Sequence, residues 1–247
     1  MDDVKIAALR RLIDSSENIV FFGGAGVSTE SQIPDFRSAN GLYHPQLKQV
    51  YPPEKILSHS FFMSQPEIFY HFYKEKMIYE NAKPNPAHLA LAKLEASGKL
   101  RAVVTQNIDG LHQLAGSKNV FELHGSIHRN YCMNCGKFFE LDWIIHSEGV
   151  PRCDVCGGMV KPDVVLYEEN LDMEVLENAL RAIELADVLI VGGTSLIVYP
   201  AASLIHYYKG DKLVLINKSK TAHDQRAVIQ IDDAIGEVLG KCVLELD

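Results

Sequence analysis

The chain has 247 residues, of which 47% are hydrophobic and 23% are charged. This length and composition place it among ordinary soluble proteins built from one large domain, or from one large domain with a small insertion. The formal net charge of −8 at pH 7 argues against direct binding of nucleic acid, because nucleic-acid-binding proteins usually carry a basic face. Basic protein tails remain compatible partners.

The N-terminal residues lack the basic start and the apolar core of a secretory signal. No apolar run in the sequence reaches the roughly 20 residues that a membrane-spanning helix needs. The sequence therefore predicts a cytoplasmic protein that does not associate with membranes.

Helical and strand patterns alternate at both ends of the chain. Helical spacing is found at residues 6–13, 85–97 and 173–186, with Asn85 and Asp172 as N-cap residues of the second and third helices. Apolar, strand-like runs occupy residues 18–22, 101–105, 119–123, 187–191 and 212–216. This alternation is typical of an α/β fold with a doubly wound, Rossmann-like parallel sheet.

Two segments, residues 38–83 and 128–161, lack this alternation. We interpret them as insertions that form a smaller domain over the edge of the sheet, the first helical with a cofactor loop and the second metal-binding. Residues 1–37, 84–127 and 162–247 then form the Rossmann-like domain.

A glycine-rich turn follows the first predicted strand. Gly24, Ala25 and Gly26 resemble a dinucleotide phosphate loop, and Ser28 would donate to a phosphate at the N-terminus of the next helix. A short glycine-rich turn also occurs without a nucleotide, so this motif alone is weak.

A second such turn, Gly193-Thr194-Ser195, follows strand 187–191, and two phosphate cradles suit a dinucleotide. The third glycine and the acidic residue of the usual fingerprint are missing, so the site is not a standard hydride-transfer site. Asn217, directly after strand 212–216, would reach a ribose hydroxyl, although an asparagine in a turn is equally common.

Polar side chains follow two neighbouring strands. Strand 101–105 ends at Gln106-Asn107-Ile108-Asp109, and strand 119–123 ends at His124. Ligands of open α/β sheets lie outside the carboxyl ends of the strands, so amides, a carboxylate and an imidazole gathered there predict one polar pocket. A polar loop with a structural histidine is the alternative.

Four of the five cysteines form two Cys-x-x-Cys pairs, Cys132 with Cys135 and Cys153 with Cys156, separated by 17 residues. This spacing suits a tetrahedral zinc site, and four thiolates leave no open position for catalysis, so the zinc is predicted to be structural. Disulfides are the alternative reading. The fifth cysteine, Cys242, lies in an apolar run and is predicted to be a buried thiol.

Taken in order, these motifs resemble the sirtuin family of NAD-dependent protein lysine deacylases, as a bacterial-type member, over nearly the whole chain. Residues 24–28 resemble the family's phosphate loop, residues 33–37 its cofactor-binding loop and residues 105–109 its nicotinamide-pocket motif. His124-Gly125 resembles the catalytic pair, the four paired cysteines resemble the zinc ligands, and residues 193–195 resemble a third NAD motif.

The resemblance implies a set of site residues and one reaction. His124 would act as general base, with Asn107 holding the ribose. The implied NAD contacts are Gly24, Ala25, Gly26, Ser28, Asp35, Phe36, Arg37, Gln106, Asn107, Ile108, Asp109, Gly193, Thr194, Ser195 and Asn217. Val164, Val165 and Tyr167 would bind an acyl-lysine protein or peptide. The acyl group would pass to ADP-ribose, with release of nicotinamide and free lysine, and the four cysteines would hold one structural zinc.

The sequence departs from the family pattern at several positions. Gly23 stands where the family often has threonine, Gln32 where it usually has glycine, and Glu168 where it has the glycine of Phe-Gly-Glu. Tyr73 stands where an arginine, three residues after Tyr70, would hold an acidic acyl group. A neutral acyl group, acetyl first, is therefore expected.

Two functions of other classes remain open from the sequence. One is a protein mono-ADP-ribosyltransferase on the same fold, which would not need His124 as a base. The other is a zinc-ribbon interaction module without catalysis, which the acidic charge and the polar strand ends oppose.

Overall fold

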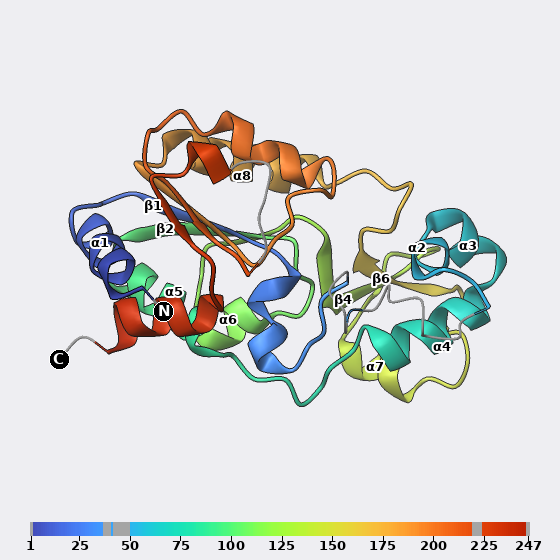
Figure 1. Cartoon of the computed structure of the whole chain (residues 1–247). Helices are drawn as coiled ribbons and strands as arrows, with labels where there is room; N and C mark the ends of the chain where they lie inside the picture. Colours follow the sequence, from blue (N-terminus) through green and yellow to red (C-terminus); the bar gives the residue numbers. More distant parts are fainter. Residues whose placement is uncertain (1, 37–40, 42–49, 219–223, 246–247) are drawn as a thin grey trace.

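A computed structural model describes residues 2–36, 41, 50–218 and 224–245. Its main feature is a six-stranded parallel sheet, in the strand order β3-β2-β1-β7-β8-β9 (Figure 1). The strands are β1 (Ile19–Gly23), β2 (Leu100–Thr105), β3 (Val120–Glu122), β7 (Val188–Gly192), β8 (Leu213–Ile216) and β9 (Ile229–Ile231). Counted within this sheet alone, the order is 3-2-1-4-5-6, which confirms the predicted Rossmann-like α/β fold.

Helices cover both faces of the sheet. One face packs against α1 (Asp3–Asp14), α5 (Pro86–Ala96) and α9 (Ile235–Leu239), and the other packs against α8 (Met173–Leu185) and the 3₁₀ helix η3 (Ala201–Tyr207). Along β1, Ile19 and Phe21 face the first set of helices, whereas Val20 and Phe22 face the second. Because both faces are buried, the central strands β1, β7 and β8 are continuous apolar runs without alternation.

The predicted helix starts are confirmed at Asn85 and Asp172. The Asn85 side chain accepts from the backbone N–H of Ala87, and Pro86 occupies the first helical turn. The Asp172 side chain accepts from the N–H of Val175 at 3.0 Å. These side chains satisfy backbone donors that a helix start otherwise leaves unpaired.

A smaller module lies beside the sheet, at the end of the molecule opposite both termini (Figure 1). It contains an antiparallel sheet in the order β5-β4-β6. Its strands are β4 (Gly125–Cys132), β5 (Phe138–Phe139) and β6 (Val160–Val164), and its helices are α2 (Pro53–Ile56), α3 (His59–Ser64), α4 (Pro66–Lys76) and α7 (Leu141–His146). Residues from 56–73 and from 127–166 form one hydrophobic core. The exact limits of the two insertions stay a prediction.

Short helical turns complete the described chain. They are α6 (Leu111–Ala115), η1 (Ala25–Val27), η2 (Thr29–Ser31), η4 (Asp224–Arg226) and the π-helical η5 (Gly240–Leu244). The glycine-rich turn after β1 thus leads into two 3₁₀ turns around Ser28, where the sequence pattern indicates a helix N-terminus. Within the described ranges, every helix is too short or too polar to span a membrane.

Candidate active site

The loops after β1 and β7 meet at the point where the strand order of the sheet reverses. The Gly26 N–H donates to the Gly193 carbonyl at 2.8 Å. A Cβ atom on Gly26 would lie 2.8 Å from that same oxygen, and Gly193 has a φ of +60°, so both positions favour glycine. Two backbone loops in this contact form the crevice in which Rossmann-like folds bind dinucleotides.

A cavity of about 1360 Å³ opens at this crevice and extends to the smaller module. Every described residue of the predicted cofactor and peptide sites lines it. They are Gly24, Ala25, Gly26, Ser28, Asp35, Phe36, Gln106, Asn107, Ile108, Asp109, His124, Val164, Val165, Tyr167, Gly193, Thr194, Ser195 and Asn217. The remaining residue, Arg37, lies outside the described residues.

Side chains from two loops form a buried hydrogen-bonded group in the cavity wall. The Ser28 hydroxyl donates to Asp109 Oδ2 at 2.6 Å and accepts from Asn107 Nδ2 at 3.0 Å. Ser28 is therefore oriented toward Asp109 in this structure, and its hydroxyl proton is already used. The group fixes the side chains of Asn107 and Asp109, and both residues line the cavity.

A second group joins the loops after β2, β7 and β8. Gln106 Nε2 donates to Thr194 Oγ1 at 3.0 Å, and the Thr194 N–H donates to Asn217 Oδ1 at 2.9 Å. Among the described side chains, Asn217 Nδ2 is a buried donor without a partner. Because an unpaired buried donor is costly, this N–H fits a ligand oxygen at the position predicted for a ribose.

His124 projects from the end of β3 with one nitrogen already bonded. Its Nδ1 lies 3.0 Å from the Gln106 carbonyl oxygen, which can only accept, so Nδ1 carries the proton in the neutral ring. Nε2 is then the basic nitrogen. Burial lowers the pKa of His124 below its usual 6.5, although the hydrogen bond to Gln106 opposes this shift.

The peptide backbone on either side of His124 connects the two sheets. The His124 carbonyl accepts from the Val165 N–H at 3.0 Å, and Gly125 pairs with Val164 in β6. Gly125 has a φ of +73°, and a Cβ atom there would lie 1.6 Å from the Asp163 carbonyl. Only glycine therefore lets the predicted peptide-binding strand approach the histidine so closely.

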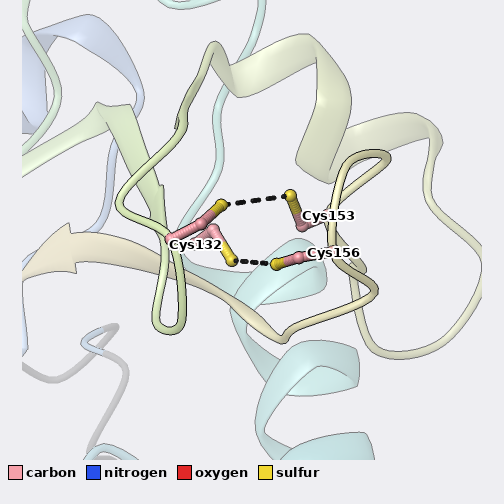
Figure 2. A group of neighbouring side chains, drawn as sticks. Cys132, Cys153 and Cys156 are labelled. Atoms are coloured by element: carbon pink, nitrogen blue, oxygen red, sulfur yellow. Dashed lines mark hydrogen bonds between the residues drawn. The ribbon is translucent and has the colours of Figure 1, made fainter.

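The four paired cysteines lie together, at the end of β4 and the turn after it and on the turn before β6. Figure 2 labels three of them, Cys132, Cys153 and Cys156. Their sulfur atoms are all within 4.8 Å of one another, with 3.4 Å between Cys132 and Cys156 and 3.7 Å between Cys135 and Cys153. In a tetrahedral site with zinc–sulfur bonds of about 2.3 Å, neighbouring sulfurs lie about 3.8 Å apart. The cluster thus fits one structural zinc, and all four are free thiols instead of disulfides.

The two cysteine turns repeat one local geometry. The N–H of Asn134 lies 3.4 Å from Cys132 Sγ, and the N–H of Val155 lies 3.4 Å from Cys153 Sγ. Such N–H groups stabilise thiolates, and backbone hydrogen bonding, chiefly from Cys135, lowers the pKa of Cys132 to about 6. Cys242 is a separate buried thiol, as predicted, and burial raises its pKa to about 11.

Comparisons with known proteins place the chain in one family. A model of the Sir2 family matches residues 24–200. The chain belongs to the Sir2 family. The resemblance found in its motifs is thereby confirmed.

Among Sir2 relatives, an NAD-dependent protein deacetylase of Clostridium tetani is 68% identical over 96% of this chain and 97% of its own length. One of Clostridium perfringens is 64% identical over 98% of this chain and 100% of its own. A solved structure of Sir2 with a p53 peptide and NAD⁺ has a TM-score of 0.83 and 40% identity, covering 96% of each chain. A Sir2 variant with a deacetylated p53 peptide and 3′-O-acetyl ADP ribose has a TM-score of 0.88 and 40% identity, covering 97% of each chain.

Two departures from the Sir2 pattern share a physical property. Gln32 has a φ of +66° and Glu168 a φ of +75°, so both occupy the left-handed region at positions where the family has glycine. Glu168 has compensating contacts, because its carboxylate accepts from the Ser60 N–H at 2.9 Å and from the Ser60 hydroxyl at 3.0 Å. These bonds join the loop after β6 to the start of α3.

Tyr70 and Tyr73 lie in the core of the smaller module and are 1% and 0% exposed. Neither lines the cavity. The Tyr70 hydroxyl donates to the Val160 carbonyl, and burial raises the pKa of both phenols. The two side chains are therefore packing residues in this member of the family.

Part of the cavity wall comes from residues that the sequence did not indicate. Met77, Tyr79, Leu141 and Ile145 line the cavity from the chain after α4 and from α7. They lie in the segments without clear periodicity, so only their aliphatic and aromatic character could have indicated them. His128 also lines the cavity, and its Nε2 lies 3.1 Å from the Asp109 carbonyl oxygen.

Proposed function

We propose that the protein is an NAD-dependent protein lysine deacetylase. One observation carries this proposal: the His124 imidazole lies in the same cavity as both glycine-rich loops and the Val164–Val165 segment. A base that serves a dinucleotide and a peptide together must face both. The names of the Sir2 relatives support the same activity.

In this proposal the dinucleotide phosphates bind to backbone N–H groups of the turn from Gly24 to Ser28 and to Ser195. Asp109 and the Ile108 backbone hold the nicotinamide carboxamide. Asn107 holds the ribose, Asn217 donates from Nδ2 to the second ribose, and Phe36 shields the reacting face. Arg37 completes the cofactor loop with Asp35, and Gln106 keeps Thr194 in place through its hydrogen bond.

The proposed chemistry begins with attack of the acyl carbonyl oxygen on C1′ of the nicotinamide ribose, as the bond to nicotinamide breaks. His124 Nε2 then takes the proton of a ribose hydroxyl, whose oxygen attacks the former acyl carbon. Addition of one water and departure of the amine yield free lysine and O-acetyl-ADP-ribose. The hydrogen bond to Gln106 keeps the proton on Nδ1, so Nε2 is available as the base.

The zinc has a structural role in this proposal. Four thiolates fill a tetrahedral site, and the ion would hold the turns of the smaller module from which β4 and β6 run to the cavity. No chemical step needs it.

The proposed substrates are acyl-lysine proteins or peptides that pair with Val164, Val165 and Tyr167. Acetyl stays the acyl group that the sequence predicts, because Tyr73 brings no positive charge where an arginine would hold an acidic acyl group. A cytoplasmic location and the absence of direct nucleic-acid binding stay predictions of the sequence.

The test is to incubate the protein with an acetyl-lysine peptide, with and without NAD, and to follow all products by mass spectrometry. We expect NAD-dependent loss of acetyl from the peptide. A peptide that gains the mass of ADP-ribose would instead support the mono-ADP-ribosyltransferase alternative. Faster removal of succinyl than of acetyl from a matched peptide would contradict the acyl preference.

A further inference from the structure

The strand that follows His124 is irregular at one place. β4 pairs regularly with β6 at Gly125 and Ser126 and again from Asn130, but the register shifts between Ser126 and Asn130. The residues inside this bulge turn back toward the larger domain. The Ile127 N–H donates to the Ile108 carbonyl at 3.0 Å. Bulges of this kind re-aim side chains beside a site.

Arg129, the last residue of the bulge, connects two acidic side chains. Its Nη1 donates to Glu122 Oε2 at 2.6 Å, and its Nε donates to Asp163 Oδ2 at 2.7 Å. The Glu122 side chain is only 7% exposed, so its carboxylate needs a charged partner. A guanidinium is planar and rigid, which fixes the angle between the two carboxylates that it holds.

The two acidic residues stand next to the two halves of the site. Glu122 ends β3 two residues before His124, and Asp163 lies in β6 one residue before Val164. Near this bridge, the hydrogen bond from the Val165 N–H to the His124 carbonyl also joins the two segments. The bridge therefore spans the distance between the proposed base and the proposed peptide strand.

We propose that Arg129 is a positioning residue, which sets where the His124 imidazole lies relative to the acyl-lysine peptide. This inference rests on the proposed function. Arg129 does not line the cavity, so it acts only through Glu122 and Asp163. The loops predicted to hold NAD are fixed by other contacts, such as the one between Gly26 and Gly193.

The experiment compares Arg129→Met, Arg129→Lys and the wild type. Small displacements of reacting groups can cost about 10²-fold in rate, so we expect Arg129→Met to lower kcat/KM for an acetyl-lysine peptide by about 10- to 100-fold. We expect the dissociation constant for NAD, measured by calorimetry, to stay within about twofold. Lys209→Met is the matched control, because it removes an exposed ion pair with Glu184 far along the chain.

Arg129→Lys separates positioning from charge. Lysine keeps the positive charge but presents a single ammonium, which does not hold two carboxylates in a fixed fork. Positioning predicts a loss of kcat/KM in Arg129→Lys as well. Wild-type kcat/KM in Arg129→Lys would show that only the charge matters and would overturn the inference.

A second readout does not depend on activity. The imidazole NMR signals of His124 should move in Arg129→Met, because the end of β3 loses its anchor, and should stay in Lys209→Met. His124 signals that do not change in Arg129→Met overturn the inference, even if the wild type does not deacetylate peptides. An inactive wild type counts against the proposed function alone. If Arg129→Met does not fold, Asp163→Asn replaces it, because this variant keeps the buried ion pair between Arg129 and Glu122. An unchanged KM for the peptide in Asp163→Asn would count against positioning.

Discussion

At the scale of single residues, His124 combines a free ring nitrogen, a fixed tautomer and a place in the cavity wall. General bases typically contribute about 10² to 10⁴-fold to a rate. We therefore expect His124→Ala to lower kcat for deacetylation by that factor, while circular dichroism and the affinity for NAD stay close to those of the wild type. A folded variant with ordinary kcat would rule out His124 as the base.

The pH dependence of kcat/KM, which reports pKa values of the free enzyme, tests the same residue. A general base must be unprotonated, and burial lowers the pKa of His124 below 6.5. The acid limb of the profile should therefore have its midpoint below pH 6.5, so the enzyme keeps most of its rate at that pH. A midpoint clearly above 6.5 in the kcat/KM profile would contradict the burial argument.

Several individual residues were predictable because their chemistry is visible in the sequence. Gln106, Asn107, Asp109 and His124 are polar groups that follow apolar strands, and they do line one cavity. Partners were not predictable in the same way. The bond between Ser28 and Asp109 joins residues 81 positions apart, and only the folded chain shows that it uses the serine proton.

At the scale of elements, the cysteine turns are the parts most dependent on a bound ion. A structural zinc contributes binding energy directly to folding. Cys153→Ser leaves three thiolates, so we expect less than one zinc per chain, a lower melting temperature and a lower soluble yield. Cys242→Ser is the matched control, because it changes a buried thiol outside the cluster. Equal zinc content and melting temperature in Cys153→Ser and the wild type would refute a zinc site at these cysteines.

Elements with a clear apolar pattern were predictable, including the short strand β3, whereas β9 and α9 were not. The predicted strand at residues 101–105 corresponds to β2, which is mostly apolar, and the predicted helix at 173–186 corresponds to α8, whose apolar residues recur at helical spacing. β9 has only three residues, and α9 begins beside a distant partner, since the Gly236 N–H donates to Glu30 Oε2 at 2.7 Å. Contacts between segments far apart in the chain produce no pattern in the local sequence from which the element could be predicted.

At the scale of the whole molecule, two buried histidines make stability depend on pH. His88 and His112 are 0% and 1% exposed, with ring centroids 4.7 Å apart. Burial lowers the pKa of His88 to about 4 and, together with the neighbouring His88, lowers that of His112 to about 3. Between these values and 6.5 the unfolded chain binds more protons than the folded one, so the free energy of unfolding falls as pH falls.

His112→Phe tests this effect. At pH 5, about 1.5 units below the ordinary histidine pKa, an imidazole that the fold keeps neutral lowers the free energy of unfolding by about 2 kcal/mol. We measure the free energy of unfolding in urea at pH 7.5 and at pH 5. Between these two values it should fall by about 2 kcal/mol less in His112→Phe than in the wild type. His71→Phe, at an exposed position, should follow the wild type. Equal losses in His112→Phe and the wild type would contradict the depressed pKa.

The arrangement of the whole site also exceeds what the sequence predicts. The doubly wound parallel sheet and the two glycine-rich loops were expected, but the size of the cavity depends on how the smaller module packs beside the sheet. That packing rests on Gly125 and on the bridge made by Arg129, which join residues of both sheets. The sequence around Gly125 and Arg129 does not indicate which residues they contact.

The proposed transfer of an acetyl group to ADP-ribose is tested most directly with a peptide whose acetyl carbonyl carries ¹³C. The peptide is incubated with NAD and the protein, and the labelled products are counted by mass spectrometry. For each lysine released, we predict one labelled O-acetyl-ADP-ribose and one nicotinamide. His124→Ala should form both products more slowly than the wild type. Labelled free acetate formed without consumption of NAD, or ADP-ribose attached to the peptide, would contradict the proposed function.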